Sequence, residues 1–267
     1  MATCSLVIST YNWPKALDFC LQSVMQLRQL PYEVLVADDG SGPETRRLIE
    51  SFQEIFPVPL IHVWHEDNGF QLARIRNRAI AKATGDYIVQ VDGDVILHPN
   101  FIKDHLRLSK KGYFVVGSRG SLSKAFTEKL LHYIKLPDTS VLRRHVTSKL
   151  NTLRNFYLSN FLSNKYKVHG KYKYYAKGCN MAFWRLDAIT VNGYNETMVG
   201  WGREDEELVS RFIIFGLKKQ FLKMGGVVYH IWHKKAAHQN EPANLEIVYK
   251  TRAEANYRSA LGLDQYK

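Results

Sequence analysis

The stretch between residues 85 and 96 constrains the fold of this chain more than any other. It is an apolar run rich in β-branched and aromatic residues, and it stops at two acids, Asp92 and Asp94, with only Gly93 between them. Such a run predicts a buried strand that ends where the backbone leaves a sheet, and open α/β sheets bind ligands at such strand ends. If extended geometry continued past Asp92, both carboxylates would share one face, and a divalent cation would relieve their repulsion. A polar turn explains the acids equally well, since Asp-Gly is a common turn dipeptide.

Strands and helices alternate on either side of this run. Four more apolar runs predict strands, at residues 4–9, 32–37, 60–64 and 113–117. Four segments between the strands carry helix signals, at residues 14–27, 43–56, 70–82 and 99–109. The alternation predicts an α/β fold with a mostly parallel, Rossmann-like central sheet that is covered by helices on both faces. Further along, residues 178–185 and 227–233 return to strand, and residues 242–267 predict a polar tail helix.

Most of the positive charge of the chain lies in one segment. Residues 123–177 hold twelve Lys and Arg against two acids, which accounts for ten of the formal net charge of +12. The segment also holds nine aromatic residues, and Leu150, Leu153, Tyr157 and Phe161 predict an amphipathic helix. We expect a helical basic insertion that lies across the ligand edge of the sheet. Its charge indicates an anionic partner, for which we favour an acidic, phosphorylated or lipid-linked glycan, or an anionic membrane face, over nucleic acid.

Composition indicates a globular protein of a reducing compartment. Hydrophobic residues make up 45% and charged residues 23% of the chain, and no uncharged apolar run approaches the roughly 18 residues of a membrane span. The first ten residues lack the basic region of a secretory signal. The three cysteines, Cys4, Cys20 and Cys179, have neither metal-like nor redox-like spacing. We therefore expect a cytoplasmic protein, with a peripheral position at the inner membrane face if the basic segment meets lipid.

Two late motifs carry further candidate site residues. The run Gly200-Trp201-Gly202-Arg203 precedes four acids, Glu204 to Glu207, and the helix dipole alone explains acids in a first helical turn. Because consecutive helical residues point about 100° apart, at most two of the four acids can face one pocket. His230 and His233 end the late strand, and a structural role explains either of them taken alone.

In their order and spacing, these motifs resemble the family-2 glycosyltransferases with the GT-A fold. The residues that carry this resemblance are 7–12, 36–41, 68–69 with 76–77, and 92–94. The second half is similar to the galactosyltransferase-type C-terminal region of β-1,4-galactosyltransferases and bacterial chondroitin-polymerase-like enzymes, through residues 201–206 and His230. The resemblance covers residues 4–118 and 178–233 and leaves the basic segment outside.

The resemblance implies a nucleotide-sugar donor, most often a UDP-sugar, and inversion at the anomeric carbon. The positions that match the donor site of the family are Thr10, Tyr11, Asn12 and Asp39 for base and ribose, Asp92 near the ribose, and Arg76 near the nucleotide. A guanidinium suits a diphosphate whether or not the likeness holds. Trp201 offers a flat apolar face for a sugar ring.

The resemblance also implies a metal ion and a catalytic base. Asp94 matches the metal ligand and His230 the histidine that completes the site, with His233 a rival in the same His-x-x-His. A carboxylate, an imidazole and diphosphate oxygens suit Mn²⁺, with Mg²⁺ as the alternative ion. Asp205 matches the general base that takes the proton of the acceptor hydroxyl, and Glu204 is expected to orient the acceptor. Ala79 stands where many family members have glycine, a change that a helix tolerates.

We expect four parts in the chain: a nucleotide-sugar-binding half at residues 1–118, the basic aromatic insertion at 119–177, an acceptor-binding and catalytic half at 178–240, and a helical tail at 241–267. The function expected is that of an inverting, metal-dependent hexosyltransferase that moves a hexose or N-acetylhexosamine to a bacterial surface glycan such as lipopolysaccharide or capsule. Two alternatives stay open. A nucleotidyltransferase also uses paired acids and a divalent ion but has no use for residues 201–207, and a degenerate transferase scaffold could bind glycan or nucleic acid without catalysis.

Overall fold

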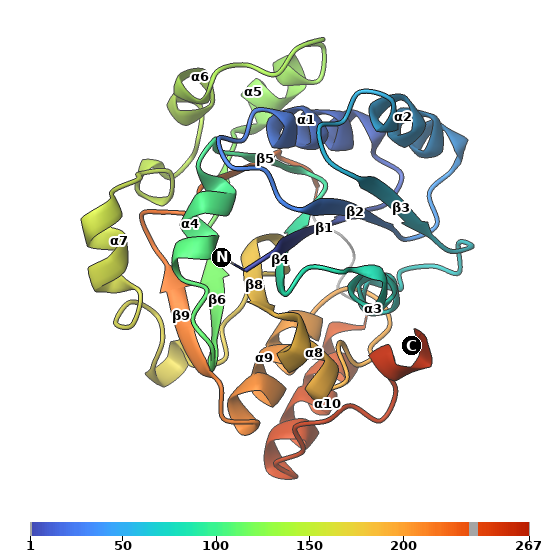
Figure 1. Cartoon of the computed structure of the whole chain (residues 1–267), viewed down its shortest axis with the longest axis vertical. Coiled ribbons are helices and arrows are strands. Elements are labelled where there is room, and N and C mark those ends of the chain that lie inside the picture. The colour runs from blue at the N-terminus through green and yellow to red at the C-terminus, as the bar shows by residue number, and fades with distance from the viewer. Residues whose placement is uncertain (1, 235–239, 267) are drawn as a thin grey trace.

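A seven-stranded sheet forms the centre of the molecule in the computed structural model, which describes residues 2–234 and 240–266 (Figure 1). From one edge to the other, its strands are β3 (Leu60–Trp64), β2 (Glu33–Asp38), β1 (Cys4–Thr10), β4 (Tyr87–Asp92), β8 (Met181–Trp184), β6 (Tyr113–Gly117) and β9 (Lys218–Leu222). Strand β8 runs antiparallel to both of its neighbours, and the other neighbouring pairs are parallel. The prediction of a mostly parallel α/β sheet is confirmed.

Helices cover both faces of this sheet, as the alternation in the sequence predicts. One apolar cluster joins the sheet to α1 (Pro14–Met25), α2 (Pro43–Gln53) and α4 (Phe101–Arg107). The cluster on the opposite face joins it to α3 (Leu72–Lys82), α8 (Arg185–Thr190) and α9 (Glu204–Ile214). Within β1, Leu6 belongs to the first cluster and Val7 to the second, because successive strand residues point to opposite faces. Both faces of the strand are therefore buried, which is why its sequence is continuously apolar rather than alternating.

The chain turns directly after Asp92, and extended geometry does not continue to Asp94. Gly93 and Asp94 form a turn, after which β5 (Val95–Leu97) enters a second, three-stranded sheet with β10 (Val228–His230) and β7 (Gly120–Ser121). A Cβ on Gly93 would lie 3.1 Å from the carbonyl oxygen of Ser9, so the turn leaves little room for another residue. The two acids therefore do not share a strand face, and each has partners of its own.

The first part of the basic segment folds onto this second sheet. Helices α5 (Lys124–Leu130) and α6 (Thr139–Arg144) contribute Phe126 and Leu142 to an apolar cluster with Ile96 of β5. Ala16 and Phe19 of α1 belong to the same cluster, so this part of the segment is anchored between α1 and the second sheet.

The predicted extent of the amphipathic helix between Leu150 and Phe161 is wrong. Residues 149–151 form only a short 3₁₀ turn, and the helix α7 (Phe156–Leu162) begins after Asn155. The side chain of Asn155 accepts a hydrogen bond from the N–H of Leu158 at 3.0 Å, and an Asn in this capping position favours a helix start there.

The prediction of an insertion across the ligand edge of the sheet does not describe helix α7. Helix α7 lies along the edge strand β9 and not across the carboxyl edge of the sheet (Figure 1). Backbone hydrogen bonds fix it there, because the N–H of Asn155 donates to the carbonyl of Met224 and the N–H of Phe221 donates to that of Ser163.

The polar tail helix is shorter than predicted. Helix α10 (Glu241–Ala253) ends before Ala255, which has a positive φ of 50°, and a 3₁₀ turn over Leu263–Tyr266 follows. The last predicted position, Lys267, lies outside the described residues. Helix α10 packs on α9. Across residues 2–234 and 240–266, no helix combines the length and the apolar character needed to cross a bilayer.

Candidate active site

Three strand ends bring predicted site residues to one edge of the sheet. Strand β1 lies between β2 and β4, in a register that sets Thr10 opposite Asp38 and Ser9 opposite Asp92. All three strands are parallel, so their carboxyl ends lie at the same edge, where α/β sheets bind ligands. The loops that follow these strands carry the predicted donor residues, and they therefore lie on one side of the molecule.

Arg76 of α3 ties this edge to the start of α9. Its side chain is 1% exposed. Nε donates to Ser9 Oγ at 3.1 Å, Nη2 to Asp92 Oδ1 at 3.0 Å, and Nη1 to Asp205 Oδ1 at 3.0 Å and Glu204 Oε1 at 3.4 Å. Burial lowers the pKa of Arg76, but these carboxylates and a neighbouring tyrosine raise it by more, so the guanidinium stays charged. Three predicted site residues thus meet on Arg76, and they occupy most of its donors.

Asp205 is held from three sides. Besides the contact with Arg76, Oδ2 accepts from the N–H of Gly178 at 2.6 Å and Oδ1 accepts from the hydroxyl of Tyr194 at 3.3 Å. The side chain of Asp205 is still 18% exposed, so a ligand can reach it. A Cβ on Gly178 would collide with Asp205 and would lie 2.7 Å from Arg76 Nη2, so this position requires glycine. The sequence analysis missed Gly178 and Tyr194, because a backbone donor and a buried hydroxyl belong to no recognisable motif.

The four acids at the start of α9 face two different environments. Glu204 and Asp205 face Arg76, whereas Glu206 pairs with Arg203 and Arg252, and Glu207 pairs with Arg211. This division confirms that at most two of the four face one pocket.

Two of the acids around Arg76, Glu204 and Asp92, have pKa values raised toward neutral pH. Burial raises the pKa of Glu204 to about 7, with a further contribution from the charge of Asp205 and against the opposing charge of Arg76. Burial also raises the pKa of Asp92 to about 6, although Arg76 opposes the rise. Several carboxylates that share one guanidinium cannot all be ionised without cost.

A second cluster, formed by Asp94, His230 and His233, has the chemistry of a metal site. A donor atom of each residue lies within 4.8 Å of the donor atoms of the other two. Asp94 Oδ2 lies 3.3 Å from His230 Nε2 and 3.1 Å from His233 Nε2. The second oxygen, Asp94 Oδ1, is buried and has no hydrogen-bond partner among residues 2–234 and 240–266. A metal ion would satisfy this oxygen, and one carboxylate with two imidazoles suits Mn²⁺.

Both histidines are placed to serve as ligands, so they need not be rivals. His233 Nδ1 donates to the carbonyl of Lys234 at 2.9 Å, which leaves Nε2 for a metal. Burial lowers the pKa of His230 to about 4 against the opposing charge of Asp94, so this imidazole is neutral at neutral pH. The hydrogen bond with Asp94 raises the pKa of His233 despite burial. Burial raises the pKa of Asp94, but the two histidines together lower it by more.

The predicted loop after β1 is braced against the loop after β2. Asn12 Oδ1 accepts from the N–H of Gly42 at 2.9 Å, and the N–H of Asn12 donates to Ser41 Oγ at 2.8 Å. The hydroxyl of the half-exposed Tyr11 donates to Asp67 at 2.9 Å. The two loops are therefore shaped by contacts with each other, as a pre-formed ligand site requires.

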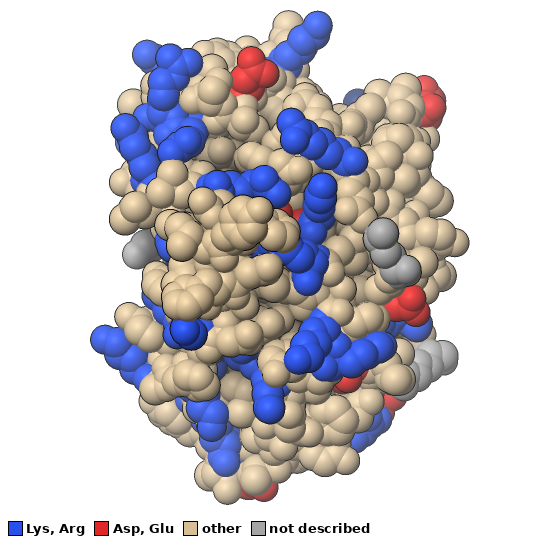
Figure 2. Space-filling model, turned by 60° about the vertical axis from the view of Figure 1, so that its left-hand side comes forward, with Lys and Arg blue, Asp and Glu red and all other residues tan. Residues whose placement is uncertain are grey.

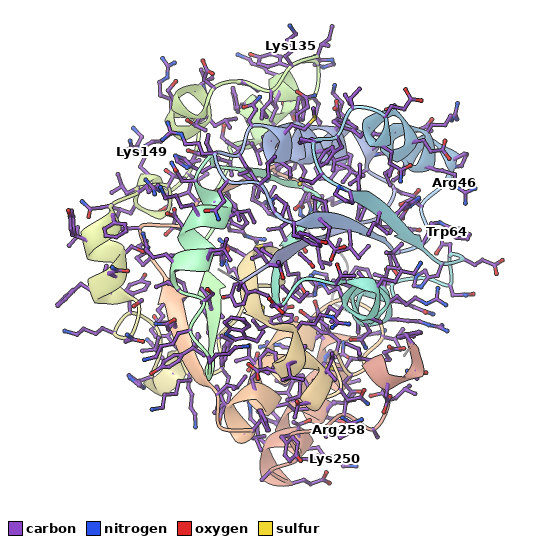
Figure 3. All side chains as sticks on the ribbon, viewed as in Figure 1. Arg46, Trp64, Lys135, Lys149, Lys250 and Arg258 are labelled. Atoms are coloured by element: carbon purple, nitrogen blue, oxygen red, sulfur yellow. The ribbon has the colours of Figure 1, made fainter. Side chains whose placement is uncertain are left out.

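Asp39 is buried at the base of these loops. Its Oδ2 accepts from the N–H of Gln71 at 2.9 Å, and its Oδ1 lies 2.8 Å from His65 Nε2. Beside it opens a hollow of about 340 Å³ lined by Trp64, His65, Glu66, Asn68, Arg74 and Arg78. At the outer end of β3, Arg46 lies over the ring of Trp64 at 5.3 Å (Figure 3).

Two cations that the sequence analysis did not single out lie beside both clusters. Arg119 follows β6 at the carboxyl edge, and its Nη1 donates to Cys179 Sγ at 3.8 Å. Lys177 directly precedes Gly178. Both are partly buried, and among the residues that the structure describes neither has a carboxylate within ion-pairing distance. The contact of Arg119 with Cys179, two residues after Lys177, brings it near Lys177, and the charge of Arg119 adds to burial in lowering the pKa of Lys177. In the sequence, Arg119 lies just before the basic segment and Lys177 is the last of its cations, and neither belongs to a recognisable motif.

Trp201 lies in the loop before α9 and is 38% exposed. The flanking Gly200 and Gly202 have φ values of 78° and 107°, which residues other than glycine rarely adopt. Next to this loop, a hollow of about 230 Å³ is lined by Gln71, Arg74, Glu196, Met198, Val199, Leu261 and Gln265. The two glycines therefore set the path that presents Trp201 near the start of α9.

Two family models match the chain and overlap within the basic segment. The family described as glycosyl transferase family 2 matches residues 5–176. The family described as N-terminal domain of galactosyltransferase matches residues 159–234. Because the first match runs through residues 119–176, the expectation that the basic segment lies outside the resemblance is wrong.

Curated proteins similar to the chain include the chondroitin synthase of Pasteurella multocida (strain Pm70). The chain is 26% identical to it over 238 residues, which is 85% of this chain and 24% of that protein. It is 25% identical over 223 residues to the validoxylamine A glucosyltransferase of Streptomyces hygroscopicus subsp. limoneus, which is 80% of this chain and 48% of that protein. The chain spans about a quarter to a half of the length of these relatives.

Solved structures share the fold at low sequence identity. S. aureus TarS 1-349 in complex with UDP-GlcNAc matches with a TM-score of 0.67 and 15% identity, over 99% of this chain and 69% of that one. The mannosyltransferase PcManGT from Pyrobaculum calidifontis, in complex with GDP-Man and Mn²⁺, matches with a TM-score of 0.63 and 16% identity, over 95% of this chain and 64% of that one. These likenesses confirm the predicted GT-A fold.

Proposed function

The chain belongs to glycosyl transferase family 2, and we propose that it moves a hexose or N-acetylhexosamine from a UDP-sugar to a hydroxyl group of a glycan, with inversion at the anomeric carbon. One observation carries this proposal. Asp205 and Asp92 converge on Arg76 beside the cluster of Asp94, His230 and His233, at the carboxyl edge of the sheet. A base and a cation site placed side by side are what transfer from a nucleotide sugar requires.

The donor is assigned to the loops after β1 and β2. We propose that Thr10, Tyr11, Asn12 and the buried Asp39 bind the base and ribose of the nucleotide. Asp92 is assigned to the ribose. The contact between Asn12 and Gly42 and the hydrogen bonds of Asp39 support this assignment, because they hold the loops in one shape. The ligands named for the two similar structures, UDP-GlcNAc and GDP-Man, are nucleotide sugars and agree with a donor of this class.

The diphosphate is assigned to Arg119 and Lys177 rather than to Arg76. The donors of Arg76 are engaged by Asp92, Glu204 and Asp205, so we assign it to the positioning of those acids. Arg119 and Lys177 have no carboxylate partner among the described residues. The phosphate oxygens of a diphosphate would supply the anionic partner that they lack. A divalent cation, Mn²⁺ or Mg²⁺, held by Asp94, His230 and His233 would neutralise charge on the same phosphates.

Asp205 is assigned as the general base. As the acceptor oxygen bonds to the anomeric carbon, the bond from that carbon to the diphosphate breaks, its electron pair leaves with the phosphate, and the acceptor proton passes to Asp205. Attack from the face opposite the leaving group inverts the configuration. Gly178 and Arg76 hold the carboxylate in place, while Glu204 orients the acceptor and Trp201 offers a flat face to a sugar ring.

The acceptor is assigned to anionic or lipid-linked glycans of a bacterial surface, such as lipopolysaccharide or capsule. The charge of residues 123–177 supports an acidic acceptor, and the chondroitin synthase among the relatives is named for an acidic polysaccharide. A peripheral position at the cytoplasmic face of a membrane would follow from a lipid-linked acceptor.

Calorimetric titration with UDP tests the donor half of this proposal. We expect UDP to bind in the presence of Mn²⁺, and Arg119→Gln to weaken this binding about tenfold, because a charged hydrogen bond is lost. Arg144→Gln is the matched control, since it removes the same charge from an exposed position of the basic segment. Equal binding by Arg119→Gln and wild type would contradict the diphosphate assignment, and absence of UDP binding would contradict the donor class.

A further inference from the structure

Helix α7 has its polarity reversed relative to an ordinary surface helix. Its buried residue is a serine, Ser159 at 0% exposure, and Ser163 just after the helix is also buried. The large apolar side chains point outward instead, with Tyr157 at 82% and Phe161 at 61% exposure. A helix that packs on a soluble domain normally buries its apolar stripe and exposes its polar one. The outward face of α7 is therefore unexplained by the folding of this chain.

The reversed helix is held rigidly on the molecule. Arg107 of α4 donates to Ser159 Oγ at 2.8 Å and lies over the ring of Phe156 at 4.7 Å. Just before the helix, Lys223 donates to Asn151 Oδ1 at 2.8 Å and to the carbonyl of Leu150. The N–H of Asn155, just before α7, donates to the carbonyl of Met224, the residue after Lys223, so residues 150–151 and the start of α7 are held by the same two residues after β9. The exposed apolar side chains of this stretch are Leu150, Phe156, Tyr157, Leu158 and Phe161. We call these five residues the α7 patch.

Two exposed lysines lie at the α7 patch. Lys165 lies over the ring of Phe161 with its Nζ 3.9 Å from the ring centre, and Lys149 adjoins Leu150 (Figure 3). The face of the molecule on this side shows many Lys and Arg side chains and few acids (Figure 2). Exposed aromatic side chains beside lysines match the interface of a bilayer, where aromatic rings sit at the level of the head groups and lysines reach anionic phosphates.

We propose that the α7 patch, with Lys149 and Lys165, is a docking surface for an anionic lipid bilayer. Charge complementarity selects this occupant, because residues 123–177 carry ten of the net positive charges of the chain and a protein partner would need an equally acidic surface. The docking goes beyond the proposed transferase function, and its test involves no catalysis, so either can fail without the other.

Co-sedimentation with lipid vesicles tests the proposal. We expect the wild-type chain to sediment with phosphatidylcholine vesicles that contain phosphatidylglycerol, to bind vesicles of phosphatidylcholine alone far more weakly, and to be released by salt. Tyr157→Ser with Phe161→Ser is expected to lower the affinity more than tenfold, and Lys149→Glu with Lys165→Glu by about the same factor. All four side chains are exposed, so the variants are expected to keep the thermal midpoint of the wild type.

Matched controls come from α10. Tyr249→Ser removes an aromatic side chain that is 58% exposed, and Lys250→Glu reverses an exposed charge (Figure 3). Both are expected to bind vesicles like the wild type. The proposal is overturned if the wild type does not bind anionic vesicles, or if the α7 variants lose no more affinity than the controls. It is also overturned if Tyr157→Ser with Phe161→Ser instead dissociates a dimer in size-exclusion chromatography, which would assign the patch to a second copy of the chain.

Discussion

Arg76 Nη1 lies 3.0 Å from Asp205 Oδ1, and this ion pair joins α3 to α9 across 129 residues of sequence. The same guanidinium holds Asp92 at the end of β4. Asp205, the proposed general base, is therefore tied through Arg76 to the end of strand β4, at the edge of the sheet assigned to the donor. This connection explains how residues from two distant parts of the chain form one site.

Replacing Asp205 by Asn is expected to lower kcat about 10²–10⁴-fold, because the amide cannot take the acceptor proton. Asn keeps the shape of the side chain, so the affinity for UDP with Mn²⁺ should stay at the wild-type value. Steady-state kinetics with an acceptor and calorimetry with UDP measure the two quantities. Glu254→Gln, directly after α10, is the control. If Asp205→Asn has the same kcat as this control, another group takes the proton.

Replacing Gly178 by Ala is expected to displace Asp205, because the added Cβ would collide with its carboxylate and come 2.7 Å from Arg76 Nη2. A displaced catalytic group costs on the order of 10²-fold in kcat. The thermal midpoint should fall by only a few degrees, about what overpacking of 1–3 kcal/mol causes. Unchanged kcat in the folded variant would mean that the N–H of Gly178 does not set the position of the base.

Sequence reasoning predicted the fold well where one short-range pattern decided the outcome. The apolar runs of β1, β2 and β4 are buried on both faces and could be read directly. The helix around Tyr157 could not be predicted in this way. Its apolar side chains point outward, and the periodicity of a sequence does not show which face of a helix packs against the protein. Likewise, the sequence left open whether Asp92 and Asp94 share a strand face or lie in a polar turn, and the turn at Gly93 sends them to separate partners.

Sequence motifs single out the acids of the candidate site and Arg76, which holds them, but not Gly178 or Arg119. Glu204, Asp205 and Asp94 belong to motifs with known spacing. Gly178 acts through its backbone N–H and Arg119 through its position beside β6, and such roles appear only when the chain is folded. The contacts that position a site are mostly long-range, so a local pattern cannot report them.

Replacing Glu204 by Gln is expected to stabilise the metal-free protein at pH 8 and to change it little at pH 5. The pKa of Glu204 is raised from its ordinary value of 4.5 to about 7 by burial and by Asp205. Its protonated form therefore contributes stability below pH 4.5, and this contribution is lost as the pH rises through 7. The gain at pH 8 is on the order of 1–3 kcal/mol, which a thermal melt in EDTA resolves.

On the same helix, Glu206→Gln should change the stability at pH 8 in the opposite direction to Glu204→Gln. Burial raises the pKa of Glu206, but the hydrogen bonds from Arg203 and Arg252 lower it by more. Its ionised form contributes stability above the ordinary value of 4.5, and that contribution is lost only at lower pH. The Gln variant is therefore expected to be less stable than the wild type at pH 8. A gain in stability there would contradict the distinction between the two acids.

Mn²⁺ is expected to raise the thermal midpoint of the wild type, and EDTA to reverse the rise. Asp94→Asn, His230→Ala and His233→Ala should each weaken Mn²⁺ binding at least about tenfold in calorimetry. Binding should also weaken between pH 7.5 and 5.5, because His233 has a raised pKa and must lose its proton to serve as a ligand. His132→Ala at an exposed position is the control. Unchanged affinity in His233→Ala would leave His230 as the histidine ligand.

The most direct test of the central claim is the release of UDP from a panel of UDP-sugars, measured with Mn²⁺, with EDTA and with Asp94→Ala. The account predicts slow hydrolysis of one UDP-sugar in the presence of Mn²⁺, and no hydrolysis of that donor in EDTA or in the Asp94→Ala variant. If every donor stays intact and none binds, the chain does not use a nucleotide sugar at this site, and the transferase assignment is contradicted.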